Sequence, residues 1–178
     1  MTPGPDPFLH RQMQHDIWAT ERLMQRCRKL TRDQLELTVP GTFGTIRRTL
    51  AHIVAADERY LARLLGVWDE EPLREAPDVA LDTIAQHLPH VRDGVERLFS
   101  GATLDPERVL ADTPLRRFAP NSARFEMEVW VPAAQLINHG TDHRTHVNTI
   151  LGANGLETVD VQVWPYAIEL NASHEAKP

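Results

Sequence analysis

Four segments of the chain repeat apolar residues at intervals of three and four, the spacing that places them along one side of an α-helix. We expect helices over residues 7–30, 45–66, 78–99 and 132–152. A helix with one apolar side is stable in water only when that side packs against another element. The pattern therefore predicts an all-α protein, a four-helix bundle whose core lies between the four apolar sides.

Residues that commonly begin helices stand at these boundaries. Asp6 can cap the first helix and Pro7 suits its first position. Thr42 or Thr45 can cap the second helix, and Asp78 can cap the third. The capping pattern supports the helix positions that the apolar spacing indicates.

The segments between and after the helices carry weaker patterns. Pro89 lies inside the third helix and has no backbone N–H, which predicts a kink or a break near Gln86. From residue 101 to 130 the periodicity fades, and 124–130 alternates as an extended segment does. We expect a long connection there before the last long helix. The closing segment 159–170 is too short for a bundle helix and is expected to pack as a lid.

Composition limits the kind of protein this is. At 178 residues and 42% apolar residues, residues 1–178 are expected to form a single domain. The net charge of −6 disfavours nucleic acid as a partner, and no run of apolar residues is long enough to span a membrane. Cys27 is the only cysteine, so it is expected to be a buried apolar residue rather than part of a disulfide. These features predict a soluble, cytoplasmic protein.

Two histidines interrupt the apolar side of the last long helix. His139 and His143 are four residues apart, so both rings lie on the side that carries Leu136 and Val147. Burying a polar ring without a partner costs roughly 1–3 kcal/mol, and the neighbouring residues offer no evident partner. A bound divalent metal ion would satisfy both rings.

A catalytic zinc-type site usually has three protein ligands, so a third is expected from another helix. His52 is the best candidate, because its neighbours Thr49 and Ala56 are small and leave room for an ion. Alone, a histidine at this position would be interpreted as a surface or hydrogen-bonded residue. The remaining histidines lie on polar faces or near the ends and are not expected to be ligands: His10, His15, His87, His90 and His174.

Several short motifs occur together in a pattern that resembles the DinB/YfiT-like family. They are Gly44-Thr-Ile-Arg-Arg-Thr-Leu-Ala-His52, Ala56-Asp-Glu-Arg-Tyr60, Leu136-Ile-Asn-His139, His143-Arg144 and a closing segment with Asp160 and Trp164. The resemblance extends over most of the chain. It implies a four-helix bundle, commonly dimeric, with a divalent metal held by one histidine of the second helix and two of the last long helix. By position, these ligands are His52, His139 and His143.

The chain departs from the family pattern at two positions. Asp142 stands where many members have a histidine, and His146 where they often have glutamine. His146 lies one turn after His143, so it could support the ligand, shuttle a proton or be a fourth ligand. A structural or solvent-facing role for His146 is the simpler alternative.

Three neutral imidazoles would leave a coordination position open for water or substrate. Zinc or nickel is the expected metal, with iron, manganese and copper as further options. The segment His139-Gly-Thr-Asp-His143 lacks the glutamate that zinc peptidases use as a base. Asp57, Glu58 and Asp142 are the nearby carboxylates, and we expect all three to be solvated or ion-paired.

The resemblance suggests a metal-dependent enzyme that transfers a low-molecular-weight thiol, such as bacillithiol or mycothiol, in detoxification or stress response. A small-molecule substrate and a homodimer are then expected. Two alternatives stay open: a non-catalytic stress-related protein that binds a metal or ligand, and a metal-dependent hydrolase. A set of aromatic residues could either line a pocket at the open coordination position or belong to the core: Trp130, Trp164, Tyr166 and Phe125.

Overall fold

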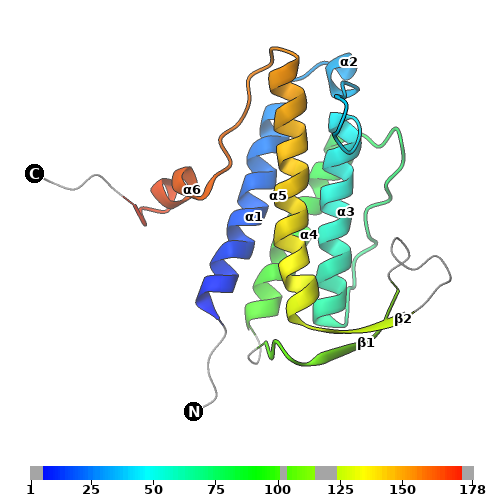
Figure 1. Ribbon diagram of the computed structural model, residues 1–178, viewed down its shortest axis with the longest axis vertical. Helices are drawn as coiled ribbons and strands as arrows, with labels where there is room; N and C mark the ends of the chain where they lie inside the picture. Colours follow the sequence, from blue (N-terminus) through cyan, green and yellow to red (C-terminus); the bar gives the residue numbers. More distant parts are fainter. Residues whose placement is uncertain (1–5, 101–103, 115–123, 174–178) are drawn as a thin grey trace, which may run out of the picture.

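Four long helices stand side by side in the computed structural model, and they confirm the all-α four-helix bundle expected from the sequence (Figure 1). They are α1 (Pro7–Cys27), α3 (Ile46–Leu65), α4 (Leu81–Ser100) and α5 (Trp130–Ala153). The structure describes residues 6–100, 104–114 and 124–173. Two shorter helices, α2 (Arg32–Leu35) and α6 (Val163–Glu169), lie outside the bundle (Figure 1).

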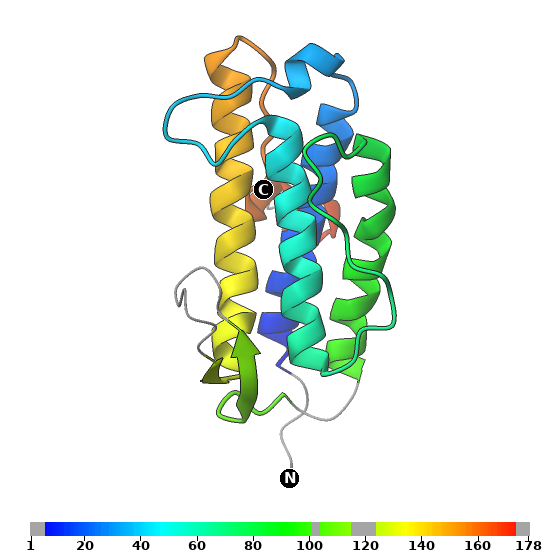
Figure 2. The same cartoon turned by 90° about the vertical axis from the view of Figure 1, so that its right-hand side faces the viewer.

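The order of helices around the bundle is α1, α5, α3 and α4, so that α3 packs between α5 and α4. In Figure 2, α3 and α4 run in the same direction, because residues 66–80 return along the length of the bundle before α4 begins. This connection lies against α3 and α4. Side chains on α3 can therefore meet three different partners: α5, α4 and the 66–80 segment.

Capping explains several helix ends. The carboxylate of Asp6 accepts hydrogen bonds from the backbone N–H groups of Phe8 (2.9 Å) and Leu9 (3.3 Å) at the start of α1. Thr45, rather than Thr42, caps α3. Gly66 ends α3 with φ of 75°, a left-handed conformation that glycine adopts without steric cost. These local signals were readable from the sequence.

The predicted start of the third helix at Asp78 is wrong, since α4 begins at Leu81. Asp78 lies in a turn that is closed by a hydrogen bond from Val79 N to the carbonyl of Ala76 (3.2 Å). The side chain that suits a helix cap suits a turn equally well. The first helix also stops at Cys27 rather than near Leu30, because residues 28–30 form a turn.

A kink or a break was predicted near Gln86, and the break does not occur, since α4 continues through Pro89. Pro89 is exposed, so water can reach the carbonyl that lacks its helical donor. Leu88 and Val91 are buried on either side of the proline. Their packing stabilises the helix across it.

The long connection before α5 contains a two-stranded antiparallel sheet. Strand β2 (Arg124–Glu128) confirms the extended segment, and it pairs with β1 (Val109–Pro114), a partner that the sequence analysis did not predict. The last long helix then begins at Trp130. The expected closing segment contains helix α6, which lies beside α1 on the side of the bundle away from α3 (Figure 1).

All four long helices contribute to the core. Cys27 is among its buried residues, and burial raises the pKa of this thiol to about 12, so it behaves as an inert apolar side chain. Across the described part of the chain, every helix is too short or too polar to traverse a lipid bilayer. The largest fully buried apolar side chains are Met13, Leu23, Met24, Ile46, Leu50, Ile53, Leu61, Ile84, Leu136, Ile150 and Leu151.

Candidate metal centre

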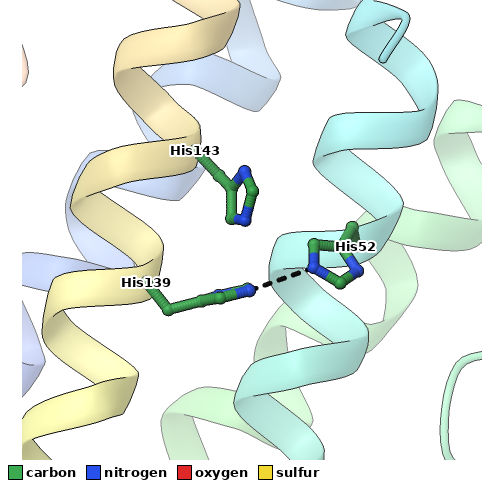
Figure 3. A group of neighbouring side chains, drawn as sticks. All are labelled: His52, His139 and His143. Carbon is green, nitrogen blue, oxygen red and sulfur yellow. Dashed lines mark hydrogen bonds between the residues drawn. The ribbon is translucent and has the colours of Figure 1, made fainter. Parts of the chain in front are cut away.

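The three histidines expected as ligands lie together between α3 and α5. His52 comes from α3, and His139 and His143 come from successive turns of α5, with all three rings turned toward one another (Figure 3). Nε2 of His52 lies 3.0 Å from Nε2 of His139. One nitrogen of each ring lies within 4.8 Å of the others. The structure thus brings together all three predicted residues.

The local sequence accounts for this convergence. Leu136 and Val147 are fully buried on the same side of α5 as the two histidines, so their packing turns both rings inward. On α3, Thr49 and Ala56 stand one turn before and after His52, and both are small and buried. Large side chains at those positions would occupy the space in which the rings meet.

Glu75 orients His52 from the 66–80 connection. Its Oε2 lies 2.8 Å from Nδ1 of His52, and its Oε1 accepts a hydrogen bond from Arg59 (2.8 Å). Burial alone would raise the pKa of Glu75, but the hydrogen bonds from His52 and Arg59 outweigh burial and lower it. The carboxylate therefore holds a proton on Nδ1 of His52, which leaves the Nε2 lone pair directed at His139. Sequence reasoning missed Glu75.

Phe43 forms an aromatic wall beside the histidines. Its ring stacks on His52 with centroids 4.2 Å apart and meets the edge of His143 at 4.8 Å. Tyr60 lies 5.8 Å from His139. Neither residue was singled out from the sequence, because nothing in a linear pattern indicates which aromatic residue lies against a given histidine.

The aromatic residues named as candidate pocket walls lie elsewhere. Trp164 and Tyr166 line a different cavity between α1, α5 and α6, and Trp130 lines a third near the start of α5. The side chain of Phe125 lies outside the described residues. The alternative that these residues line the open coordination position is therefore excluded for the three that can be placed. Trp130 and Trp164 are 53% and 71% exposed and are not core residues either, whereas Tyr166 is buried. Trp164 and Tyr166 lie away from the histidines because α6 packs against α1.

A cavity of about 430 Å³ opens beside His139 and His143, a volume that suits a small molecule. Its wall from α5 is polar, and its other wall comes from the segment just before α3. The lining residues are Gly41, Thr42, Phe43, Gln135, Asn138, His139, Asp142, His143 and His146. The histidine group is thus next to a space that a substrate could enter.

His146 supports His143. Their Nδ1 atoms are 3.2 Å apart, which is a hydrogen bond if one ring is the donor. A proton on Nδ1 of His143 would leave its other nitrogen, Nε2, able to bind a cation. His146 is outside the group formed by His52, His139 and His143, and with Asp142 and His143 it forms a separate cluster at the cavity wall.

The carboxylates near His52 in sequence were expected to be solvated or ion-paired. Asp57 and Glu58 are 1% and 0% exposed, so neither is solvated. Glu58 is ion-paired with His87, and Asp57 interacts with Asp16 and Arg144 in the core. Asp142 is exposed and is the one acidic residue among those lining the cavity. A base for chemistry in this cavity would therefore be Asp142 or His146.

Comparison with known proteins agrees with the family resemblance. A model of the DinB family matches residues 8–167, from the first turn of α1 into α6. The chain belongs to the DinB family. It is also similar to Protein DinB of Bacillus subtilis (strain 168), with 22% identity over 149 residues that cover 83% of this chain and 87% of that protein. The resemblance inferred from the motifs is confirmed.

The donor set of this DinB-family chain fits a divalent cation. Three imidazoles from two helices face one another, and two of their nitrogens are already at hydrogen-bond distance. Without a cation, at most one proton can lie between the Nε2 atoms of His52 and His139. Imidazole suits zinc, nickel, copper and iron. The group could therefore hold one such ion.

Proposed function

We propose that this DinB-family protein is a metal-dependent enzyme in which His52, His139 and His143 bind a divalent cation, with zinc or nickel preferred. The observation that carries the proposal is the convergence of the three rings beside a 430 Å³ cavity whose wall includes His139 and His143. A purely structural site would be closed by a fourth protein ligand. The described residues place no fourth histidine or carboxylate within the same group.

A divalent cation held by three neutral imidazoles supplies a Lewis acid, which lowers the pKa of a coordinated thiol or water toward neutrality. Residues of the protein orient the ligands and accept the proton. Glu75 keeps the proton on Nδ1 of His52, and Phe43 covers the ring face, so that His52 has one orientation. Asp142 and His146 are the groups at the cavity wall that could accept a proton from a substrate.

The reaction we propose is transfer of a low-molecular-weight thiol to an electrophilic small molecule. The thiol gives its proton to His146 or Asp142, its sulfur bonds to the electrophilic carbon, and the leaving group departs with the electron pair and takes up that proton. The family resemblance supports this reaction, as does a cavity with room for a small molecule. Hydrolysis would use the same residues with water as the nucleophile, and it is the second candidate.

The first test measures bound metal in protein without a histidine tag. We expect His52→Ala, His139→Ala and His143→Ala each to lose one equivalent of metal relative to the wild type while circular dichroism shows that the fold is retained. His15→Ala is the control, since His15 lies on α1 and contacts Trp18 and Tyr166. Unchanged metal content in all three variants would refute the proposed ligand set.

The second test measures turnover with thiols and model electrophiles, with and without a chelator. We expect turnover that the chelator abolishes and that the stoichiometric return of zinc or nickel restores. The same samples are assayed with ester substrates and no thiol. Ester turnover alone would favour the hydrolase, and the absence of either activity would favour a binding protein. Turnover that survives chelation would refute the metal dependence.

We also propose that the protein forms a homodimer, as the family resemblance implies. Apolar side chains on and near α6 are unusually exposed, with Trp164 at 71% and Phe8 at 70%, and Val163 and Ile168 lie beside them in sequence or space. A second copy covering this face would bury them. We expect sedimentation equilibrium to give a dimer mass, and Trp164→Glu to give a monomer. A wild type that is monomeric at every concentration would contradict the proposal.

A further inference from the structure

A second group of possible ligands lies on the side of α3 that faces α4, and its central residue is Glu58. This carboxylate has no exposed surface, although it is a charged group near the middle of a helix. Its Oε1 lies 2.7 Å from Nδ1 of His87, and its Oε2 accepts a hydrogen bond from the backbone N–H of Leu73 (2.6 Å). Buried carboxylates are uncommon unless they are paired or bind metals.

Two histidines of α4 complete the group. His87 and His90 are one turn apart, and their ring centroids are 5.5 Å apart at an interplanar angle of 76°. One ligand atom from each of Glu58, His87 and His90 lies within 4.8 Å of the other two. Nδ1 of His90 is buried and has no hydrogen-bond partner in the described part of the structure.

We propose that Glu58, His87 and His90 form a second metal site that binds zinc. Two imidazoles and one carboxylate are a donor set that zinc accepts, and a tetrahedral ion needs one more ligand. Glu70 lies outside the group as it stands, with Oε2 4.0 Å from Nε2 of His90, and its exposed side chain can supply this ligand by changing rotamer. Two carboxylates would then neutralise the charge of the ion. The site is closed by protein ligands and is structural.

An ion pair between Glu58 and His87, without a metal ion, would account for only part of this arrangement. A bond between Glu58 and His87 accounts for the burial of Glu58 and for its contact with Leu73. It gives no reason for His90 to stand one turn away with a buried nitrogen that lacks a partner. A metal ion uses all three residues at once. This inference stands on these contacts and does not depend on the activity proposed for the first site.

The second site would also brace the residues that orient the first. The 66–80 segment contacts Glu58 through Leu73, and two residues later it supplies Glu75 to His52. An ion bound to Glu58 and Glu70 would hold this segment against α3 and α4. Loss of that ion is therefore expected to weaken metal binding at His52 by a few-fold without removing a ligand from it.

The test uses tag-free full-length protein, stripped with a chelator and titrated with Zn²⁺ by calorimetry against a competing chromophoric chelator. We expect two equivalents in the wild type, one in the His139→Ala/His143→Ala double variant, and none when His90→Ala is added to it. Glu70→Gln in the double variant should keep one equivalent but bind it about tenfold more weakly.

The matched control is His10→Ala in the same double variant, because His10 is paired with Glu96 (3.0 Å) and is outside every ligand group of the described residues. It should leave the remaining equivalent unchanged. If the double variant does not fold, the comparison of wild type with His90→Ala, two equivalents against one, replaces it. No bound equivalent in the folded double variant, or one that survives His90→Ala, would overturn the proposal.

Discussion

Two polar clusters lie one residue apart along α5, and their surroundings differ. His139 and His143 turn toward α3 and the cavity, whereas Arg144 turns toward α1 and binds Asp16. His139 and His143 line a cavity that is open to small molecules. The second cluster, formed by Asp16, Asp57 and Arg144, is sealed, with no member more than 2% exposed.

The polar atoms of the two clusters also have different kinds of partner. In the sealed cluster, Nη2 of Arg144 lies 2.5 Å from Oδ1 of Asp16, and Nη1 donates to Oγ1 of Thr20 (3.0 Å). In the open cluster, ring nitrogens of three histidines face one another. One helix thus carries both a charge network that supports the fold and a ligand group that an ion would complete. If the two roles are separate, substitutions in the two clusters should change the free energy of unfolding by very different amounts.

Arg144→Met should have the largest effect, a loss of about 3–5 kcal/mol, because it leaves two buried carboxylates without their cation. Urea denaturation with chelator present measures it. Arg28→Met removes an exposed arginine paired with Asp82 (3.2 Å) and should cost less than about 1 kcal/mol. Equal losses in the two variants would mean that burial adds nothing to the network.

Gly140→Ala should destabilise the protein by about 1–3 kcal/mol, although alanine is intrinsically the better helix residue. A Cβ at this position would lie 2.6 Å from Nη1 of Arg144 and 2.7 Å from Oδ1 of Asp16. The control is Gly152→Ala on the same helix, whose Cβ would be 3.4 Å from its nearest neighbour. Thermal unfolding should separate the two, and an unaffected Gly140→Ala would show that the cluster can move apart.

Asp57→Asn should change the pH dependence of stability. Burial, and then repulsion from Asp16 and Glu58, raises the pKa of Asp57 well above 3.8, while Arg144 and Arg59 act in the opposite direction. Because the folded-state pKa is the higher one, the stability that protonated Asp57 contributes is complete below about pH 3.8. It is lost as the pH rises toward the folded-state value, by up to about 1.4 kcal/mol per pH unit.

The asparagine variant is neutral at every pH and avoids this loss. The variant should therefore gain stability relative to the wild type between pH 4 and pH 7, as measured by urea denaturation at each pH. A difference that is constant with pH would mean that Asp57 is ionised in the folded protein throughout this range.

His146→Ala should have the smallest effect on stability, under about 1 kcal/mol for the metal-free protein, because it removes one partly exposed hydrogen bond. Metal affinity should fall about 10- to 100-fold, since the variant loses the partner of His143. Competition titration measures the affinity. A loss of stability comparable to that of Gly140→Ala would show that the open cluster also supports the fold.

Sequence patterns predicted the bundle and the inward direction of His139 and His143, and the family resemblance added His52, but neither indicated the residues that face these histidines. From the sequence, His87 and His90 belong to the histidines on polar faces or near the ends, which are not expected to be ligands. The 66–80 segment instead returns along α3 and α4, and its Leu73 and Glu75 bond to Glu58 and His52. A polar face predicts a polar neighbour, and it does not indicate whether that neighbour is water or a distant part of the chain.

The amino-acid sequence by itself determined the four apolar sides and the shared direction of His139 and His143, because helical geometry sets both from residue spacing. Only the tertiary structure decided that His52 meets them, that Glu75 and Phe43 hold His52, and that Glu58 lies beside His87 and His90. Those contacts join elements far apart in the chain. They depend on how the bundle packs and on the path of its connections, and local periodicity contains no information about either.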